Sequence, residues 1–291
     1  MPEISVILPT RLRPKLFRRA LESLLNQSYS DYEIIVVDDN PQDSRLEKFP
    51  ELADMLSDKK VRVVVDPMPK NAARARNLGL NAAGGEWIAY LDDDDAYRPK
   101  KLELQLARAK QTGLPLGFCG LEYHLGIRKH YRHLDREFFE NDELLLDLQA
   151  FATTFHKNCP VRFNEELNAG EDAYLVYSLI DYFKINRVFN VPEPLMDIYP
   201  QEGLRVNTNA AGVFSAMRLI EEKFGHHFSD HARKVYKNRA YLAFYKLSEG
   251  YWHEMFRVSR ELLRLCGKNA LRLILNAWLY KFPTTRRFLV G

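Results

Sequence analysis

The segment Ala75–Asp95 reads ARNLGLNAAGGEWIAYLDDDD and contains the pattern that decides the fold. Its first part is rich in small residues and predicts a helix over Ala72–Ala83. The apolar run Trp87–Leu91 is typical of a buried strand, and four consecutive aspartates, Asp92–Asp95, follow it directly. A helix, then a buried strand, then a polar strand end is the order expected in an α/β protein.

The chain before this segment alternates strands and helices in the same way. Apolar residues at helical spacing predict a helix over Lys15–Asn26, and short apolar runs predict strands. Strands separated by helices of this length indicate a mostly parallel sheet, in which ligands bind at the carboxyl ends of the strands. The expected strands are Ile4–Leu8, Glu33–Val37 and Val61–Val65, and the polar residues after the first two are Pro9-Thr10-Arg11 and Asp38-Asp39-Asn40.

The later part of the chain is less regular and then becomes helical. The patterns predict a helix over Pro99–Thr112, a strand over Leu116–His124 and two helical stretches within 142–183. A Pro/Gly/Asn-rich loop is expected over Tyr199–Gly212. From Val213 onward the chain is predicted to be helical, with caps or breaks at Ser229-Asp230 and Lys268-Asn269.

The composition excludes several classes of protein. The 291 residues are 46% hydrophobic and 28% charged, as in an ordinary globular protein. No apolar run reaches the roughly 18 residues that cross a bilayer, and the N-terminus has no signal-peptide pattern. Three well-separated cysteines exclude a disulfide scaffold and a CxxC zinc module, and they fit a reducing cytoplasm.

The net charge of +3 conceals an asymmetry along the chain. Residues 205–291 hold 16 Lys and Arg against 6 Asp and Glu, whereas residues 1–204 hold 26 against 33. The acidic first part suggests a site for a cation or a charged substrate, and the basic tail suggests a surface for an anionic partner.

Asp92–Asp95 form the strongest chemical signal in the sequence. Crowded carboxylates repel one another unless a cation or basic residues neutralise them. Mg²⁺ or Mn²⁺ with oxygen ligands would suit such a site and keep positions open for substrate phosphates. The alternative is a solvated acidic loop that caps the helix starting near Pro99, but the preceding buried strand favours the metal site. Asp38-Asp39 repeats the pattern at an earlier strand end, where one carboxylate could cap the next segment and the other could bind a base or ribose.

The sequence has neither a P-loop nor a GxGxxG fingerprint. Phosphates would therefore be bound by a cation together with basic side chains. Lys70, Arg74 and Arg76 lie just before and within the small-residue helix and are candidates, the alternative being an ordinary solvated helix face.

Four segments carry a family resemblance: ISVILPTR (4–11), LLNQSYSDYEIIVVDDN (24–40), ARNLGLNAAGGEWIAYLDDDD (75–95) and GED (170–172). Together they resemble the inverting glycosyltransferases of family 2, which have the GT-A, Rossmann-like fold. The resemblance covers about residues 1–205 and implies a nucleotide-sugar-binding half (1–115), an acceptor-binding half with the catalytic base (116–205) and a basic helical C-terminal extension (206–291).

The resemblance implies a metal-dependent transferase that moves one sugar from a nucleotide-sugar donor, a UDP-sugar, to an acceptor hydroxyl. It assigns Asp39 to the uracil, Asp93 to the ribose, and Asp92 and Asp94 to the DxD motif with Mn²⁺ or Mg²⁺. Glu171-Asp172 matches the family's "ED" pair, in which Asp172 deprotonates the acceptor, a role that suits a carboxylate opposite the leaving nucleoside diphosphate. The alternative is a helix N-terminus, where acidic residues have a favourable charge. The implied donor-binding residues are Pro9, Thr10, Arg11, Asp39, Arg76, Asp92 and Asp93, with Asn77 beside Arg76 helping to order the diphosphate loop.

Three departures from the family pattern affect these expectations. Pro41 stands where a small polar residue is usual, and Val161–Glu165 replaces the usual GGFD segment on the acceptor side. No QxxRW motif follows Asp172, which argues against a processive polymer synthase. The family most often implies a bacterial polysaccharide or glycolipid pathway, with a sugar or a lipid-linked acceptor.

The basic tail leaves two interpretations open. Within 270–282, apolar residues share one helical face beside basic residues, which suits either a membrane interface or packing against the protein itself. We therefore expect a cytoplasmic protein, with peripheral contact to the inner face of the membrane as the alternative. His226, His227 and His231 are interpreted as solvated or capping residues, because no Cys or paired carboxylate accompanies them in that region.

Two other functions are compatible with parts of the sequence. A non-catalytic scaffold with the same fold would be favoured if Asp94 or Asp172 were misplaced. Nucleic-acid binding by the basic tail ranks last, because the tail has no recognition module and its aromatic residues line an apolar face.

Overall fold

A computed structural model of the chain describes residues 1–125, 128–132, 135–146, 154–199, 210–247, 252–271 and 274. Strands and helices alternate through the first hundred residues, as predicted. The strands are β1 (Ile4–Thr10), β2 (Tyr32–Asp38), β3 (Val61–Val65), β4 (Trp87–Tyr90), β5 (Ala96–Tyr97), β6 (Leu116–Leu125), β7 (Arg128–Arg132), β8 (Phe138–Glu140), β9 (Phe155–Lys157) and β10 (Arg187–Ile198). The helices are α1 (Pro14–Leu25), α2 (Ala53–Leu56), α3 (Ala72–Ala82), α4 (Lys101–Thr112), α5 (Asn141–Leu146), α6 (Glu171–Phe183), α7 (Ala210–Phe224), α8 (Asp230–Leu247) and α9 (Trp252–Cys266).

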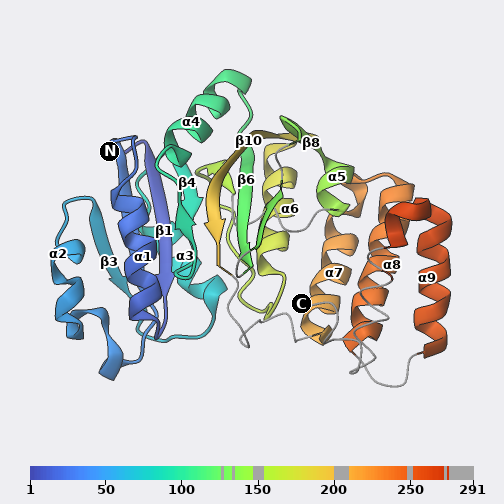
Figure 1. The fold of residues 1–291 in the computed structure, drawn as a ribbon, viewed down its shortest axis with the longest axis horizontal. Coiled ribbons are helices and arrows are strands. Elements are labelled where there is room, and N and C mark those ends of the chain that lie inside the picture. The colour runs from blue at the N-terminus through green and yellow to red at the C-terminus, as the bar shows by residue number, and fades with distance from the viewer. Residues whose placement is uncertain are drawn as a thin grey trace.

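The sheet is parallel in its first half and mixed beyond it. Its order is β3-β2-β1-β4-β9-β6-β10-β5, with β7 paired to β6 and β8 paired to β10. β3, β2, β1 and β4 run parallel, whereas the short β9 pairs antiparallel with both β4 and β6. Figure 1 shows the helices arranged around this curved sheet, with the C-terminal helices at one end. The α/β prediction is confirmed.

β1, β2 and β4 are buried on both faces, which explains their continuous apolar sequence, whereas β3 at the sheet edge is partly exposed. In β1, Val6 and Leu8 belong to the core shared with α1 and α4, while Ile7 belongs to the core shared with α3 and α6. The small residues of α3 allow this helix to lie close to the sheet. A Cβ added to Gly79 would come within 2.5 Å of Ile7 Cγ2.

Five strands, β5 and β7 to β10, were not predicted, and for β9 and β10 the sequence shows why. β9 has only three residues, too few for an apolar period to be visible. β10 contains Pro192 and Pro194, which argue against a strand. The structure accommodates them with shifts of register between β10 and β6 around Pro194.

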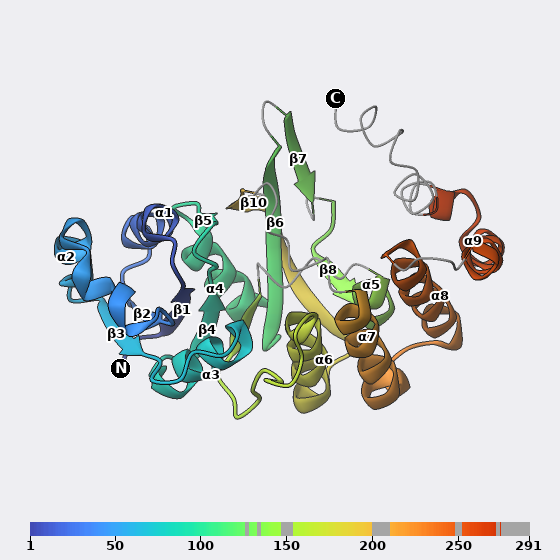
Figure 2. The same ribbon diagram turned by 90° about the horizontal axis from the view of Figure 1, so that it is seen from below.

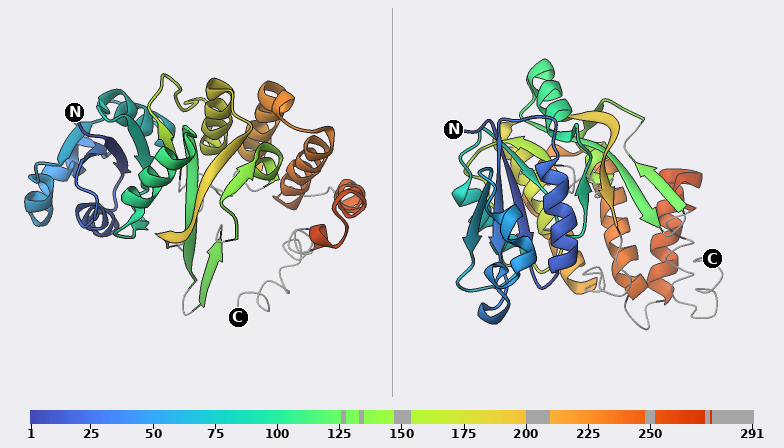
Figure 3. Two further views of the ribbon diagram at one scale, coloured as in Figure 1. Left: turned by 90° about the horizontal axis from the view of Figure 1, so that it is seen from above. Right: turned by 60° about the vertical axis from the view of Figure 1, so that its left-hand side comes forward.

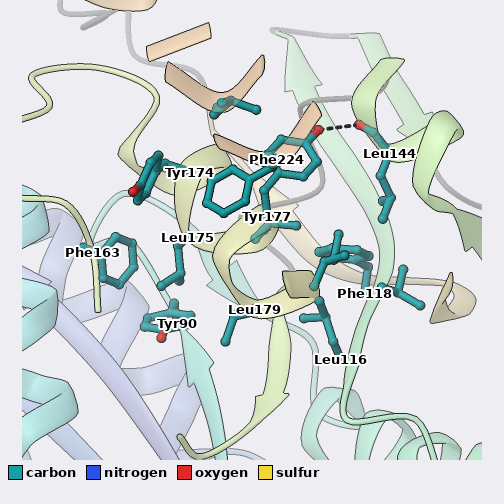
Figure 4. Packing of buried hydrophobic residues seen from close by; sticks show 14 of the residues in the cluster. Tyr90, Leu116, Phe118, Leu144, Phe163, Tyr174, Leu175, Tyr177, Leu179 and Phe224 are labelled. Atoms are coloured by element: carbon teal, nitrogen blue, oxygen red, sulfur yellow. Dashed lines mark hydrogen bonds between the residues drawn. The ribbon is translucent and has the colours of Figure 1, made fainter. Parts of the chain in front are cut away.

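The helical C-terminal region is confirmed and packs against α6. α7 begins at Ala210, inside the segment expected to be a loop, while residues 200–209 of that loop lie outside the described part. Phe224 of α7 meets Tyr174 of α6 edge-on at 5.3 Å between ring centroids, and Figure 4 shows these rings together in one core. The chain then breaks at Ser229, whose Oγ accepts a hydrogen bond from the Ala232 amide at 3.2 Å.

α8 and α9 share a further small core with the residues that follow them. Val235, Leu242, Met255, Val258 and Leu262 contribute to it. Figures 2 and 3 show α6, α7, α8 and α9 following one another away from the sheet. Of the apolar stripe predicted within 270–282, Ile274 is buried in this core and Leu271 is exposed, while its other residues lie outside the described part of the chain. Among described helices, none is both long and apolar enough to cross a membrane.

Candidate active site

The aspartate loop follows β4 at the carboxyl edge of the sheet, as predicted. The Asp95 amide donates to the Asp92 carbonyl at 3.1 Å, which closes the loop into a turn. Asp93 and Asp95 are buried. Burial raises the pKa of Asp93 to about 6, and burial together with the neighbouring carboxylates raises the pKa of Asp94 and of Asp95 above the ordinary value. A loop in this condition favours a bound cation, since a positive charge stabilises the ionised carboxylates.

Basic and hydroxyl groups from the β1–α1 segment surround the loop. Thr10 Oγ1 donates to Asp93 Oδ2 at 2.8 Å, so one of the predicted donor-binding residues contacts another. Arg13 Nη1 lies 3.2 Å from both Asp93 Oδ1 and Asp94 Oδ2. Arg19 donates to the backbone carbonyl of Asp94. Sequence reasoning missed both arginines, although their closeness in sequence to Thr10 was a usable signal.

The two aspartates that end β2 have different environments. Asp38 is structural, because its carboxylate accepts from the Asn40 amide at 3.1 Å and from the Leu46 amide at 2.9 Å. Asp39 Oδ2 pairs with Arg11 Nη1 at 3.2 Å. Asp39 Oδ1 is buried and has no hydrogen-bond partner among the described residues. Burial raises the pKa of Asp39, against the opposing charge of Arg11. Asp39 therefore presents an unused buried acceptor beside Thr10.

Arg76 connects the two acidic motifs. Its Nη2 donates to Asp92 Oδ1 at 2.7 Å and its Nη1 to Glu171 Oε1 at 3.1 Å. The guanidinium is buried, with a side-chain exposure of 7%. Burial alone would lower the pKa of Arg76, but the charges of Asp92 and Glu171 outweigh it and raise the pKa above its ordinary value. Through this one side chain, the GED segment is held beside the aspartate loop.

Asp172 lies in the first turn of α6. Gly170 precedes the helix with φ = +73°, a conformation that favours glycine, and this sharp turn directs the chain into α6. Asp172 Oδ1 accepts from the Ala173 amide at 2.7 Å. Burial and the adjacent Glu171 raise the pKa of Asp172 to about 6, although Arg76 acts in the opposite direction. This carboxylate is still mostly ionised at neutral pH and is a better matched general base than an ordinary aspartate.

Two other candidates from the sequence, Arg74 and Asn77, form their hydrogen bonds with residues outside the aspartate loop. Arg74 Nε pairs with buried Asp66 at 3.1 Å, so its charge is directed away from the aspartate loop. Asn77 accepts from the Phe163 amide at 2.8 Å and donates to Glu165 Oε1 at 2.9 Å. It therefore holds the segment 161–165, which the family resemblance assigns to the acceptor side.

Lys70 is exposed, and Pro9 lies within β1 opposite Val37. A cavity of about 910 Å³ lies beside β3; its lining includes Asp38 and Pro41 but none of the predicted donor-binding residues.

Comparison with known proteins identifies the family. The model of glycosyl transferase family 2 matches residues 5–191. A Campylobacter jejuni protein described as a GalNAc(5)-diNAcBac-PP-undecaprenol beta-1,3-glucosyltransferase is 29% identical over 205 residues, 65% of this chain and 66% of that protein. The matched regions span half to about two thirds of the length of such curated relatives.

Solved structures show the same fold. The crystal structure of S. aureus TarS 1-349 in complex with UDP-GlcNAc superposes with a TM-score of 0.70 at 18% identity, covering 99% of this chain and 88% of that one. The mannosyltransferase PcManGT of Pyrobaculum calidifontis, in complex with GDP-Man and Mn²⁺, gives a TM-score of 0.60 at 14% identity, with 99% and 83% covered. The chain belongs to glycosyl transferase family 2, a family of sugar-transferring enzymes, as its sequence motifs predicted.

Proposed function

We propose that this protein is a metal-dependent, inverting glycosyltransferase that moves one sugar from a UDP-sugar to an acceptor hydroxyl. The observation that carries the proposal is that Arg76 bonds to both Asp92 and Glu171. These bonds bring the aspartate loop, which would hold the metal, next to the Glu171-Asp172 pair, which contains the proposed base. A transferase needs both, one group to stabilise the departing diphosphate and one to activate the acceptor.

The donor nucleotide is proposed to bind at Asp39. The uracil ring of a uridine nucleotide carries one N–H donor, which would satisfy the buried, unused Oδ1 of Asp39. Thr10 and Arg11 lie beside it, toward Asp93, where a ribose would follow. The S. aureus neighbour was solved with UDP-GlcNAc, which supports a uridine donor for a protein of this fold.

The donor atoms around the aspartate loop fit Mg²⁺ or Mn²⁺. They are carboxylate oxygens, which both ions prefer. Asp92 and Asp94 are proposed to hold the ion, whose remaining positions would be filled by substrate phosphates and water. Such an ion supplies positive charge to the leaving diphosphate. Arg13 and Arg19 neutralise the loop and are placed to contact the same phosphates.

Asp172 is proposed as the general base. Its carboxylate takes the proton of the acceptor hydroxyl while the acceptor oxygen bonds to the anomeric carbon. The bond from that carbon to the diphosphate oxygen breaks, and its electron pair leaves with the UDP. Attack from the face opposite the leaving group inverts the anomeric configuration. Arg76 keeps Glu171 paired, so that Asp172 is the carboxylate left to accept the proton.

The acceptor is proposed to be a sugar, free or lipid-linked, in bacterial polysaccharide or glycolipid assembly. The name of the C. jejuni relative includes an undecaprenol diphosphate, which supports a lipid-linked acceptor at the cytoplasmic face of a membrane. The basic C-terminal helices suit peripheral contact with that anionic surface. The lack of a QxxRW motif supports transfer of a single sugar.

The test is a panel of nucleotide sugars, with binding and slow donor hydrolysis measured with and without Mn²⁺. The proteins are the wild type, Asp94→Ala and Asp172→Asn. We expect one UDP-sugar to bind only with metal, Asp94→Ala to abolish that binding, and Asp172→Asn to keep binding while hydrolysis falls by about a hundredfold or more. Absence of binding by every nucleotide sugar under every metal condition would refute the enzyme and favour a scaffold.

A further inference from the structure

A second group of metal-type ligands lies at the far end of α6 from Asp172. Asp181 is in the last turn of α6, and His226 and His227 form the short 3-10 helix η6 (Gly225–His227) between α7 and α8. His227 Nε2 lies 2.9 Å and His226 Nε2 lies 3.5 Å from the same oxygen, Asp181 Oδ1. The sequence alone could not find this group, because Asp181 is 45 residues from His226 along the chain.

The spacing of these atoms fits a tetrahedral ion. Zn²⁺ binds imidazole nitrogen and carboxylate oxygen at about 2.0–2.1 Å, which places neighbouring ligands about 3.3 Å apart. The two nitrogen-to-oxygen distances bracket that value, and all three ligand atoms lie within 4.8 Å of one another. Two imidazoles and a carboxylate are a ligand set for Zn²⁺ and similar transition metals, not for Mg²⁺.

The local charge also suits a cation. The last turn of α6 carries the negative end of the helix dipole. Lys184 Nζ contacts Asp181 Oδ1 at 3.1 Å, but this side chain is 74% exposed and can turn into solvent when an ion takes its place. The His226 ring is 62% exposed, so an ion has direct access, whereas His227 is largely buried and fixes the position.

Another group of possible metal ligands is already neutralised by cationic side chains of the protein. Glu122, His124 and Asp197 also lie close together. However, Arg98 pairs with both carboxylates, at 2.5 and 2.8 Å, and Lys129 pairs with Glu122 at 2.6 Å. Protein cations already neutralise that cluster, so we assign no metal to it.

We propose that Asp181, His226 and His227 bind one Zn²⁺ ion, or a transition metal of similar preference, with water in the remaining position. The ion links the end of α6 to the turn between α7 and α8. Because α6 carries Asp172 at its other end, the metal stabilises the packing of the helical extension against the helix of the catalytic base. The site is independent of the donor-binding metal.

The test uses full-length protein freed of any affinity tag, stripped of metal and titrated with Zn²⁺ by calorimetry and with Co²⁺ by visible absorption. The wild type should bind one equivalent with the intense absorption of tetrahedral Co²⁺, and Zn²⁺ should raise its melting temperature. His226→Ala, at an exposed position, and Asp181→Asn should each weaken binding by about tenfold or more and remove the thermal shift.

Two matched controls separate this site from other ligands. His231→Ala removes a nearby histidine outside the group, and Asp94→Ala removes the aspartate-loop ligand; both should bind Zn²⁺ as the wild type does. Circular dichroism verifies that every variant is folded. Failure of the wild type to bind an equivalent of Zn²⁺, or binding by folded His226→Ala and Asp181→Asn as tight as that of the wild type, would overturn the proposal.

Discussion

Replacing Arg76 with glutamine tests the connection between the two acidic motifs. The change removes two charge-assisted hydrogen bonds, to Asp92 and to Glu171. The bond to Glu171, whose side chain is 18% exposed, is worth about 2 kcal/mol by the usual range for charged partners. Asp92 is 40% exposed, so solvent screening reduces its share to about 1 kcal/mol. We expect Arg76→Gln to lower the free energy of unfolding by about 3 kcal/mol, measured by urea denaturation.

The same variant should change the pH dependence of activity. The charge of Arg76 lowers the pKa of Asp172, which burial and Glu171 raise to about 6. Without that charge the pKa rises further, so a smaller fraction of Asp172 is ionised at any pH near it. A general base must be ionised, and the acid limb of the rate profile should therefore move to higher pH. Donor hydrolysis from about pH 5 to about pH 8 would show the rate falling most at the acid end.

Arg74→Gln is the matched control for this prediction. Arg74 lies on the same helix and also forms a buried ion pair, with Asp66 at 3.1 Å, but that pair is outside the aspartate loop. Its loss should reduce stability and leave the acid limb in place. If Arg76→Gln were folded and its acid limb coincided with that of Arg74→Gln, the inferred coupling of Arg76 to Asp172 would be refuted.

Three further predictions each concern the surroundings of one residue. Asp39→Ala should weaken UDP binding by about tenfold, the value of one hydrogen bond to a charged acceptor, while an unchanged calorimetric Kd would exclude Asp39 from the base site. Lys101 is fully buried, and burial lowers its pKa to about 8. Between about pH 8 and about pH 10.5 the unfolded chain therefore binds more protons than the folded protein, and the free energy of unfolding rises with pH by about 3 kcal/mol. Lys101→Met should remove this rise, and a pH–stability curve of the variant parallel to that of the wild type would contradict the argument. Gly170→Ala should cost at least about 1 kcal/mol more than Gly113→Ala, since both have positive φ but only the first places a Cβ 2.9 Å from that of Ala216; equal melting temperatures would refute the steric argument.

The first half of the fold was predictable because its strands are short apolar runs with polar ends. β3 was predicted to the residue, at Val61–Val65, and β1, β2 and β4 differ from prediction only at their ends. The strands of the second half depend on tertiary pairing. β10 tolerates two prolines because its register shifts around Pro194, and no local pattern reports such a shift.

The site was predictable only where its residues are contiguous. Asp92–Asp95 follow one another, so the sequence displays the cluster directly. The Arg76–Glu171 contact joins positions 95 residues apart, and which side chain an arginine on α3 reaches depends on how α3 and α6 pack. The sequence placed Arg76 near the diphosphate loop and gave no sign of its second bond.

The packing of α6 suggests why the helical extension accompanies this catalytic fold. The predicted division at residue 205 separates the base from the extension in sequence, yet one buried core crosses it, with Tyr174 and Tyr177 of α6 against Phe224 of α7 (Figure 4). Ala216 of α7 also leaves no room for a side chain at Gly170, the residue that turns the chain into the first turn of α6. Because a well-packed core transmits even small displacements, loosening α7 would move the first turn of α6. The extension is therefore part of what positions Asp172, the proposed base, whatever it binds on its outer face.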